Sequence, residues 1–260
     1  MAYEPFDLKG KTALITGGNS GIGLGMADAV ARSGADICIW GTNPEKNKAA
    51  VKSLEKHGTK VKAFQCDVSN ETAVEECFSE TLSLFGRVDA CFANAGTGTL
   101  GMRFNEMSTE EWKRVMDINL DGFFFTMRIA SRHMVERAKN GDAGGRLIGT
   151  SSLGAICGMA MAEHYAASKG AVLSIMQGLA VEFARFAITA NSILPGHIET
   201  GMTEKRYQDE KFTNAILPRI PMRRWGNPDD FGGIAVYLMS DASCYHTGDM
   251  FIIDGGFFLN

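Results

Sequence analysis

Short apolar runs alternate along the chain with longer segments in which apolar residues recur at helical spacing. The first run, from Thr12 to Thr16, is β-branched at both ends and leads directly into a glycine-rich loop. Behind that loop, apolar residues between Leu24 and Ala31 recur at the spacing of one helix face. The pattern therefore predicts a buried strand, a tight loop and a helix, in that order.

The same alternation continues to the end of the chain. Strands are predicted over 36–40, 60–65, 90–93, 146–150, 189–194 and 249–253. Helices are predicted from Asn43-Pro44, over 71–85, from Ser108 to about 138, over 166–186 and from Asn227-Pro228. Each parallel crossover needs a connecting element, so this order predicts an α/β fold of the Rossmann type. We expect a doubly wound sandwich, with a seven-stranded parallel sheet and helices on both faces.

Length and composition predict one domain over residues 1–260. A chain of 260 residues with 45% hydrophobic residues can bury one large core. Residues 197–217 have a poor periodic pattern and are predicted to form a mobile lid over the carboxyl edge of the sheet.

Charge and residue usage exclude several classes of partner. The formal net charge of -4, without a long basic run, argues against nucleic acid or an anionic membrane and favours a small-molecule substrate. No signal sequence or bilayer-spanning stretch is evident, so we expect a cytoplasmic protein. The six cysteines include no Cys-x-x-Cys pair and are interpreted as buried free thiols, and the five histidines lack metal-ligand spacing. No metal site is predicted.

The loop after the first strand has the spacing Gly17-x-x-x-Gly21-x-Gly23. Because it lies at a helix N-terminus, its backbone N–H groups can hold a pyrophosphate. A tight structural turn is the alternative. Thr16, Asn94, Ser152 and Pro195 all follow or end predicted strands, and ligands of such sheets bind at that edge.

Tyr165 and Lys169 are four residues apart and therefore share one face of the predicted helix. A free tyrosine titrates near ~10, and we expect the nearby ammonium to favour the phenolate, so that Tyr165 acts as a general acid or base. Ser152 can hydrogen-bond the same substrate oxygen, with Ser151 as its rival. Taken alone, the Tyr-x-x-x-Lys spacing is also that of an exposed helical pair.

Together these motifs resemble those of the short-chain dehydrogenase/reductase family over nearly the whole chain. The resemblance implies hydride transfer between a nicotinamide cofactor and a secondary alcohol or ketone. It implies a catalytic set of Asn119, Ser152, Tyr165 and Lys169. It implies that the cofactor is bound by Gly17, Asn19, Ser20, Gly21, Ile22, Gly23, Thr42, Asp67, Val68, Asn94, Ala95, Gly96, Tyr165, Lys169, Pro195, Gly196, Ile198 and Thr200.

The same resemblance assigns roles. Tyr165 passes the proton, Lys169 also holds the nicotinamide ribose, and Asn119 positions a water that connects Lys169 to solvent. A side chain that satisfies kinked helix backbone is the structural alternative for Asn119. The family commonly has two asparagines before Ala95, where this chain has Ala93-Asn94, so some hydrogen bonding between strands is expected to be lost. A homotetramer is also implied.

The cofactor's 2′ position is usually read at the end of the second strand. An NAD enzyme typically has a carboxylate at the position of Gly41, and an NADP enzyme of the family often has a basic residue at that of Asn19 or Thr42. Neither is present. Thr42, Asn43 and Lys46 can still receive a phosphate, although Asn43 can be occupied as a helix cap. The sequence favours NADP, and NAD remains the alternative.

The substrate is the least determined feature. The chain is similar to sugar-acid dehydrogenases of the gluconate and deoxygluconate type, with a pocket expected from 154–161, Glu163 or His164, and 197–202. Arg219, Arg223 and Arg224 can attract a carboxylate, although structural salt bridges are favoured for them. A 3-oxoacyl-[acyl-carrier-protein] reductase is the alternative enzyme, and a non-catalytic cofactor-sensing regulator is the alternative of another class.

Overall fold

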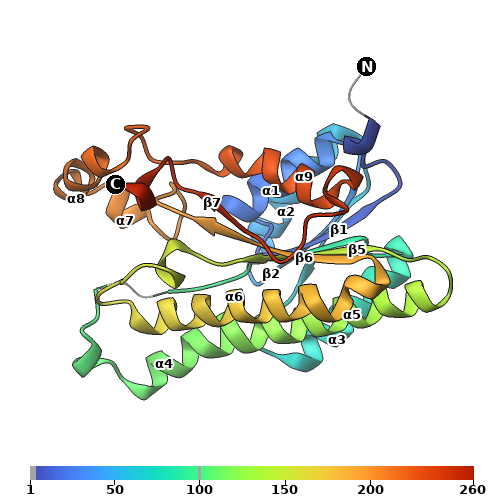
Figure 1. The fold of residues 1–260 in the computed structure, drawn as a ribbon, viewed down its shortest axis with the longest axis horizontal. Helices are drawn as coiled ribbons and strands as arrows, with labels where there is room; N and C mark the ends of the chain where they lie inside the picture. The colour runs from blue at the N-terminus through green and yellow to red at the C-terminus, as the bar shows by residue number, and fades with distance from the viewer. Residues whose placement is uncertain (1–3, 99–100) are drawn as a thin grey trace.

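The computed structural model describes residues 4–98 and 101–260, and these residues form one parallel sheet of seven strands in the order β3-β2-β1-β4-β5-β6-β7 (Figure 1). The strands are β1 (Thr12–Thr16), β2 (Asp36–Gly41), β3 (Val61–Gln65), β4 (Ala90–Ala93), β5 (Gly145–Thr150), β6 (Ile188–Pro195) and β7 (Met250–Ile253). Strand order reverses between β1 and β4, because the chain first builds outwards to β3 and then returns. The predicted doubly wound fold is confirmed.

Helices cover both faces of the sheet. The described α-helices are α1 (Gly21–Arg32), α2 (Pro44–Leu54), α3 (Glu71–Phe85), α4 (Thr109–Met116), α5 (Gly122–Lys139), α6 (Glu163–Phe183), α7 (Glu204–Tyr207), α8 (Glu210–Ile216) and α9 (Gly232–Met239). Figure 1 shows α1, α2 and α9 on one face and α3 to α6 on the other. The layers are thus helix, sheet and helix, which explains why the central strands are buried along their whole length.

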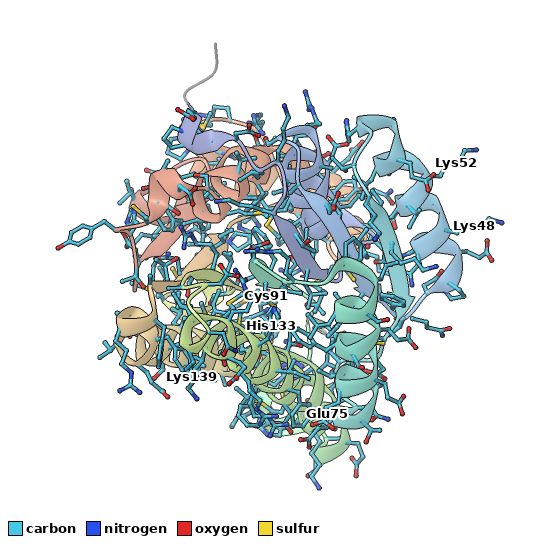
Figure 2. The ribbon with its side chains drawn as sticks, turned by 90° about the vertical axis from the view of Figure 1, so that its right-hand side faces the viewer. Lys48, Lys52, Glu75, Cys91, His133 and Lys139 are labelled. Atoms are coloured by element: carbon cyan, nitrogen blue, oxygen red, sulfur yellow. The ribbon has the colours of Figure 1, made fainter. Side chains whose placement is uncertain are left out.

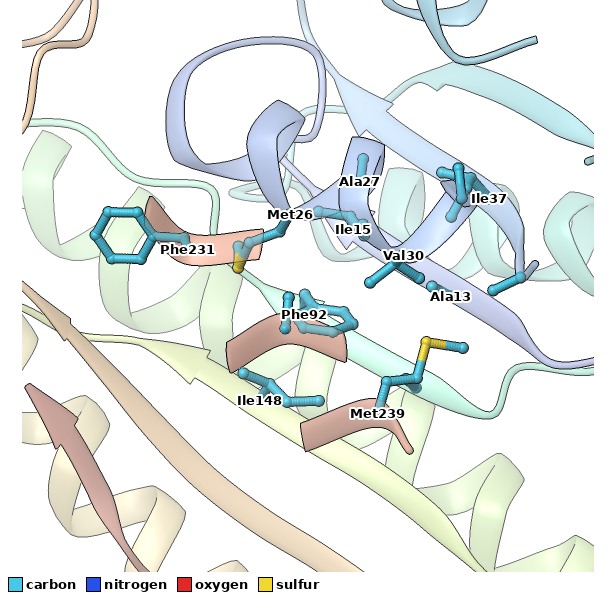
Figure 3. Close-up of a cluster of buried hydrophobic side chains, with 14 of the residues drawn as sticks. Ala13, Ile15, Met26, Ala27, Val30, Ile37, Phe92, Ile148, Phe231 and Met239 are labelled. Atoms are coloured by element: carbon cyan, nitrogen blue, oxygen red, sulfur yellow. The ribbon is translucent and has the colours of Figure 1, made fainter. Parts of the chain in front are cut away.

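One core lies between the sheet and α1 and α9. Met26 and Val30 of α1 meet Ile15 and Phe92 of the sheet, with Phe231 beside them (Figure 3). All five side chains are fully buried, so this core fixes α1, and with it the glycine loop, against the sheet.

The second core lies under α3, α5 and α6, and it contains most of the cysteines. Figure 2 shows Cys91 inside the protein, whereas Lys48 and Lys52 project outwards from α2. Four thiols are buried as predicted, those of Cys38, Cys66, Cys77 and Cys91. The prediction is wrong for Cys244, which is exposed because it ends a surface turn ahead of β7, and Cys157 is half-buried.

Three predicted segments differ from the structure. The helix expected from Ser108 to about 138 is interrupted by a π-helical turn over Asp117–Asp121, and α6 begins at Glu163 rather than 166. The segment 197–217 forms α7 and α8, which are too short to give a periodic signal. In Figure 1 these two helices lie with the C-terminus at the end of the sheet where α6 begins. In the described ranges, no helix is long and apolar enough to cross a bilayer.

Candidate active site

The glycine loop closes tightly over the end of β1. Gly17 and Gly21 have positive φ angles of 64° and 53°, which side chains rarely adopt. A Cβ atom on Gly23 would lie 2.4 Å from the carbonyl oxygen of Gly17. Gly23 is therefore needed to fold the loop onto the helix, and it does not itself line the cavity.

The side chain of Asn94 ties three strand ends together. Its Nδ2 donates to the carbonyl oxygen of Thr16 at 3.1 Å, and its Oδ1 accepts from Oγ1 of Thr150 at 3.2 Å. Oγ1 of Thr16 in turn accepts from the backbone N–H groups of Asn94 and Ala95, both at 3.0 Å. A single asparagine at this place thus still links β1, β4 and β5, although Ala93 precedes it.

These strand ends surround a cavity of about 530 Å³. Every residue that the sequence assigned to the catalytic set or the cofactor lines it, except Gly23 and Asn119. The lining also includes residues that the sequence did not assign to the site, namely Trp40, Cys66, Thr97, Ile118, Thr150 and Thr203. Thr97 follows Ala95-Gly96, and Thr150 ends β5. Because ligands of such sheets bind beyond the carboxyl ends of the strands, the positions of both residues in the sequence were sufficient to predict them.

Part of the expected substrate pocket does not line this cavity. Residues 154–161 and Glu163 lie outside the lining, and the side chain of His164 is fully buried. The N-terminal part of the predicted lid does line the cavity, through Met202 and Thr203. Thr203 stabilises this part, because its Oγ1 donates to the carbonyl oxygen of Ile198 and accepts from the backbone N–H of Thr200.

Tyr165 and Lys169 lie on the first turns of α6 and face the cavity together. Lys169 is only 4% exposed, and its Nζ donates to the carbonyl oxygen of Thr150 at 2.8 Å. Burial lowers the pKa of Lys169 to about 8. The ammonium lies 5.8 Å from the centre of the Tyr165 ring.

The expectation that Tyr165 has a lowered pKa is wrong for this structure. Burial raises the pKa of Tyr165, and its hydrogen bond with Ser152 only partly opposes that rise. Desolvation disfavours the phenolate, and at 5.8 Å Lys169 does not reverse the effect. The phenol is therefore protonated at neutral pH.

Ser152 and Ser151 have different hydrogen-bond partners, and this distinguishes the two candidates for the hydroxyl that contacts the substrate oxygen. Oγ of Ser151 donates to the carbonyl oxygen of Lys169 at 2.8 Å and is buried, so it anchors α6 to the end of β5. Oγ of Ser152 accepts from the backbone N–H of Gly154 at 3.1 Å and interacts with Tyr165. The geometry favours Ser152 as the hydroxyl beside the phenol.

Asn119 lies behind the cavity, in the π-helical turn. Its Oδ1 accepts from the backbone N–H of Thr97 at 2.7 Å, and its Nδ2 donates to the carbonyl oxygen of Thr97 and to Oγ of Ser168. The amide therefore links the π-helical turn, α6 and the segment after β4, rather than satisfying its own helical turn. A Cβ on Gly96 would lie 3.3 Å from both Oδ1 of Asn119 and Nζ of Lys169, so these two groups border one space.

The end of β2 has no carboxylate and no room for one. A Cβ on Gly41 would lie 2.2 Å from Nδ2 of Asn19 and 2.6 Å from Oδ1 of Asn47. Asn43 caps α2 as expected, its Oδ1 accepting from the backbone N–H of Lys46. Thr42, Asn43 and Lys46 all line the cavity at this end.

The three arginines that were considered for a substrate carboxylate, Arg219, Arg223 and Arg224, each contact a different partner. Arg224 forms two hydrogen bonds of 2.7 Å with the carboxylate of Asp230, and Arg223 donates to the carbonyl oxygen of Pro218. Arg219 stacks on Phe257, with 4.6 Å from its guanidinium to the ring centre. A structural salt bridge is thus confirmed for Arg224.

Comparison with known proteins decides the family. The family model described as enoyl-(acyl carrier protein) reductase matches residues 17–258. The 2-dehydro-3-deoxy-D-gluconate 5-dehydrogenase of Pseudoalteromonas atlantica is 38% identical, over 97% of this chain and 98% of that protein. The chain belongs to the short-chain dehydrogenase/reductase family.

Other members of the short-chain dehydrogenase/reductase family are nearly as similar. The crystal structure of a gluconate 5-dehydrogenase from Burkholderia cenocepacia, in complex with NADP and tartrate, superposes with a TM-score of 0.93 at 31% identity and covers both chains fully. The 3-oxoacyl-[acyl-carrier-protein] reductase FabG of Chlamydia pneumoniae is 34% identical over 96% of this chain and 97% of that protein. The prediction of an oxidoreductase that acts on CH–OH groups is confirmed.

The residues of this short-chain dehydrogenase/reductase fit the nicotinamide cofactor of its family. The glycine loop lines the cavity at the N-terminus of α1, where the first N–H groups of a helix can receive a pyrophosphate. Tyr165 and Lys169 line the same cavity, as do Pro195 and Gly196. In the described ranges, no group of three His, Cys, Asp or Glu side chains could hold a metal ion.

Proposed function

We propose that this protein is an NADP-dependent dehydrogenase that interconverts a secondary alcohol and a ketone on a sugar acid. The observation that carries the proposal is the single cavity in which the glycine loop, Ser152, Tyr165 and Lys169 meet. When bound, the nicotinamide supplies or accepts the hydride at the substrate carbon. The chain's own residues then have to hold the substrate oxygen and move one proton.

Tyr165 moves that proton. Because burial keeps its phenol protonated at neutral pH, Tyr165 donates to the carbonyl oxygen during reduction and takes the proton back during oxidation. Ser152 hydrogen-bonds the same oxygen and orients it, while the phenol and the hydroxyl remain in contact. Asn119, Ser152, Tyr165 and Lys169 are the catalytic set that we propose.

Lys169 and Asn119 connect the phenol to the proton supply. The hydrogen bond to Thr150 fixes the ammonium and leaves two of its N–H groups for the ribose hydroxyls and for a water. Oδ1 of Asn119 borders the same space and can accept from that water. The relay thus runs along α6 towards the π-helical turn of Asn119.

Two observations support NADP. Gly41 leaves no carboxylate to repel a 2′-phosphate, and Lys46 is a basic residue in the lining of the cavity. Related crystal structures of a gluconate 5-dehydrogenase and of a 2-deoxy-D-gluconate 3-dehydrogenase contain NADP.

The sugar-acid names of these relatives support the substrate class. The resemblance to the family supports a single domain and a homotetramer, and we propose a cytoplasmic location.

Thermal unfolding with saturating NADPH or NADH tests the cofactor. A ligand that binds only the native state stabilises by about 2.7 kcal/mol at a hundredfold excess over its Kd. We expect NADPH to raise the midpoint more than NADH. A larger rise with NADH would contradict the proposal.

A substrate panel tests the reaction. We expect turnover with NADP on D-gluconate or 2-dehydro-3-deoxy-D-gluconate. Turnover of an acetoacetyl thioester without turnover of a sugar acid would instead favour the 3-oxoacyl reductase, which has the same catalytic residue types. Cofactor binding without turnover of any carbonyl or alcohol would favour a cofactor-sensing regulator.

A further inference from the structure

Two glycines let the segment after β4 approach the catalytic side chains closely. A Cβ on Gly98 would lie 2.9 Å from Cδ2 of Tyr165, and one on Gly96 would lie 3.3 Å from Nζ of Lys169. Both distances are shorter than an ordinary van der Waals contact. Gly96, Thr97 and Gly98 are called the 96–98 segment below. Because this segment packs directly on the phenol ring, its position determines how closely Tyr165 is covered.

The side chain of Thr97 is held from the surface of the protein. Nη1 of Arg114, on α4, donates to Oγ1 of Thr97 at 3.0 Å. Thr97 lines the cavity, whereas the side chain of Arg114 is 43% exposed and lies outside the lining. Figure 1 shows α4 beside the N-terminal half of α6, the helix that carries Tyr165. Arg114 therefore contacts the cavity wall from its outer side.

A carboxylate fixes the orientation of this guanidinium. Nε and Nη2 of Arg114 donate to Oε2 and Oε1 of Glu111, both at 2.8 Å. The guanidinium is planar, so two parallel hydrogen bonds also fix the direction of its third donor, Nη1. Exposed ion pairs contribute little to stability in general. The bidentate geometry therefore matters here mainly because it directs Nη1 towards Thr97.

Glu111 also contacts the residue that precedes Tyr165. Nε2 of His164 lies 3.6 Å from Oε1 of Glu111, the same oxygen that accepts from Nη2 of Arg114. The imidazole is fully buried, and neither of its ring nitrogens has a hydrogen-bond partner among the described residues. The pair of Glu111 and Arg114 thus contacts both the start of α6 and the 96–98 segment.

We propose that Arg114 is a positioning residue which, supported by Glu111, holds the 96–98 segment against the ring of Tyr165. This inference rests on the proposed function and adds a residue outside the cavity on which the placement of the proton donor depends. Arg114 acts through Thr97. Asn119 fixes the backbone N–H and carbonyl oxygen of Thr97, and Arg114 fixes its hydroxyl.

Two variants and their combination test the route through Thr97. Arg114→Met removes the donor, and Thr97→Val removes the acceptor while nearly keeping the shape of the side chain. We expect each to lower kcat by about 10-fold, within the loss of up to about 10²-fold that a misplacement of roughly 1 Å can cause. Because both break the same hydrogen bond, the double variant should be no slower than Arg114→Met alone. Independent effects that multiply in the double variant would overturn the proposal.

Lys113→Met is the matched control. It removes an exposed charge from the same helix, and adjacent helical residues point in different directions. We expect it to keep the wild-type kcat, and all variants to keep the NADPH-induced thermal shift, because the glycine loop is unchanged. An equal loss of kcat in Lys113→Met and Arg114→Met would reduce the effect to general charge and overturn the positioning role.

Titration of the Tyr165 phenol gives a second readout, which does not depend on turnover. The absorbance difference between each protein and the same protein carrying Tyr165→Phe isolates this phenolate. Burial raises the pKa of Tyr165. If the 96–98 segment moves away and admits water, that pKa falls towards the ordinary value of ~10, whereas loss of a positive charge alone would raise it. Lys169 faces the phenol from α6 and is the same in all variants.

We therefore expect a lower pKa of Tyr165 in Arg114→Met than in the wild type and in Lys113→Met. An unchanged or higher pKa would overturn the positioning role, whether or not the protein turns over a sugar acid. A lower pKa in a protein that turns over no alcohol or carbonyl would support the contact while contradicting the proposed reaction.

Discussion

Nδ2 of Asn19 donates a hydrogen bond to Oδ1 of Asn47 at 2.7 Å, across the space into which a side chain at Gly41 would project. The amide of Asn47 also donates to the carbonyl oxygen of Gly41, so the glycine loop, β2 and α2 are joined at this place. The absence of a carboxylate there is therefore a property of the packing as well as of the sequence.

Gly41→Asp tests this packing. The usual substitution for NAD preference would put its Cβ 2.2 Å from Nδ2 of Asn19 and 2.6 Å from Oδ1 of Asn47, so these side chains must shift and their hydrogen bond, which joins the glycine loop to α2, is lost. We expect weaker binding of both NADPH and NADH, measured as dissociation constants by fluorescence titration. Tighter NADH binding in Gly41→Asp would show that the loop yields and that the proposed obstruction is wrong.

Lys46→Met tests the proposed phosphate contact. Lys46 lines the cavity, and its ammonium can pair with a 2′-phosphate, an interaction absent with NADH. We expect about a 10-fold rise in the Kd of NADPH and little change for NADH. Lys48→Met is the matched control, since Lys48 lies on the same helix and points into solvent (Figure 2). An equal effect of the two variants would argue for general charge, not a contact.

The sequence predicts this fold well because its strands are buried on both faces. Uninterrupted apolar runs such as that of β1 and of β4 leave little ambiguity, and the glycine and proline signals mark their ends. The seven-strand order then brings Thr16, Asn94, Ser152 and Pro195 to one edge, as predicted. The short helices α7 and α8 were not predicted, because one or two helical turns are too short to show the periodic spacing of apolar residues.

The parts of the site that the sequence did not predict depend on distances between elements. The pKa of Tyr165 is raised where the sequence predicted that it is lowered. The cost of burying the phenolate outweighs the attraction of an ammonium 5.8 Å from the ring centre. That the described residues include no ion-pair partner for Arg206 and no acceptor for the Trp225 indole is likewise invisible in a linear pattern, since it depends on which elements pack together.

Tyr165→Phe tests the proposed proton donor. The substitution removes one oxygen and keeps the ring, so we expect the fold and cofactor binding to survive. Loss of a general acid or base typically lowers kcat by about 10²- to 10⁴-fold, and the assay is turnover at saturating cofactor. A variant that retained more than about a tenth of wild-type kcat would exclude Tyr165 as the group that moves the proton.

Lys169→Met tests the buried ammonium through stability, independently of turnover. The pKa of Lys169 is about 8 in the folded protein against 10.5 for the free side chain, so between these values the unfolded chain binds more protons. Stability due to Lys169 therefore rises with pH from about 8 to 10.5, by about 3 kcal/mol at most. The thiols of Cys38 and Cys91, with pKa values raised to about 12, act in the opposite direction above pH 9 and are common to both proteins.

The difference between wild type and Lys169→Met isolates the lysine from those thiols. Unfolding free energies from urea titrations, taken at several pH values across this window, should show the wild type gaining stability relative to the variant as pH rises. A difference that stays flat would mean that the ammonium keeps its ordinary pKa. Lys169 would then be fully charged beside Tyr165 throughout the working range, and the relay through Asn119 would have to take its proton from a weaker acid.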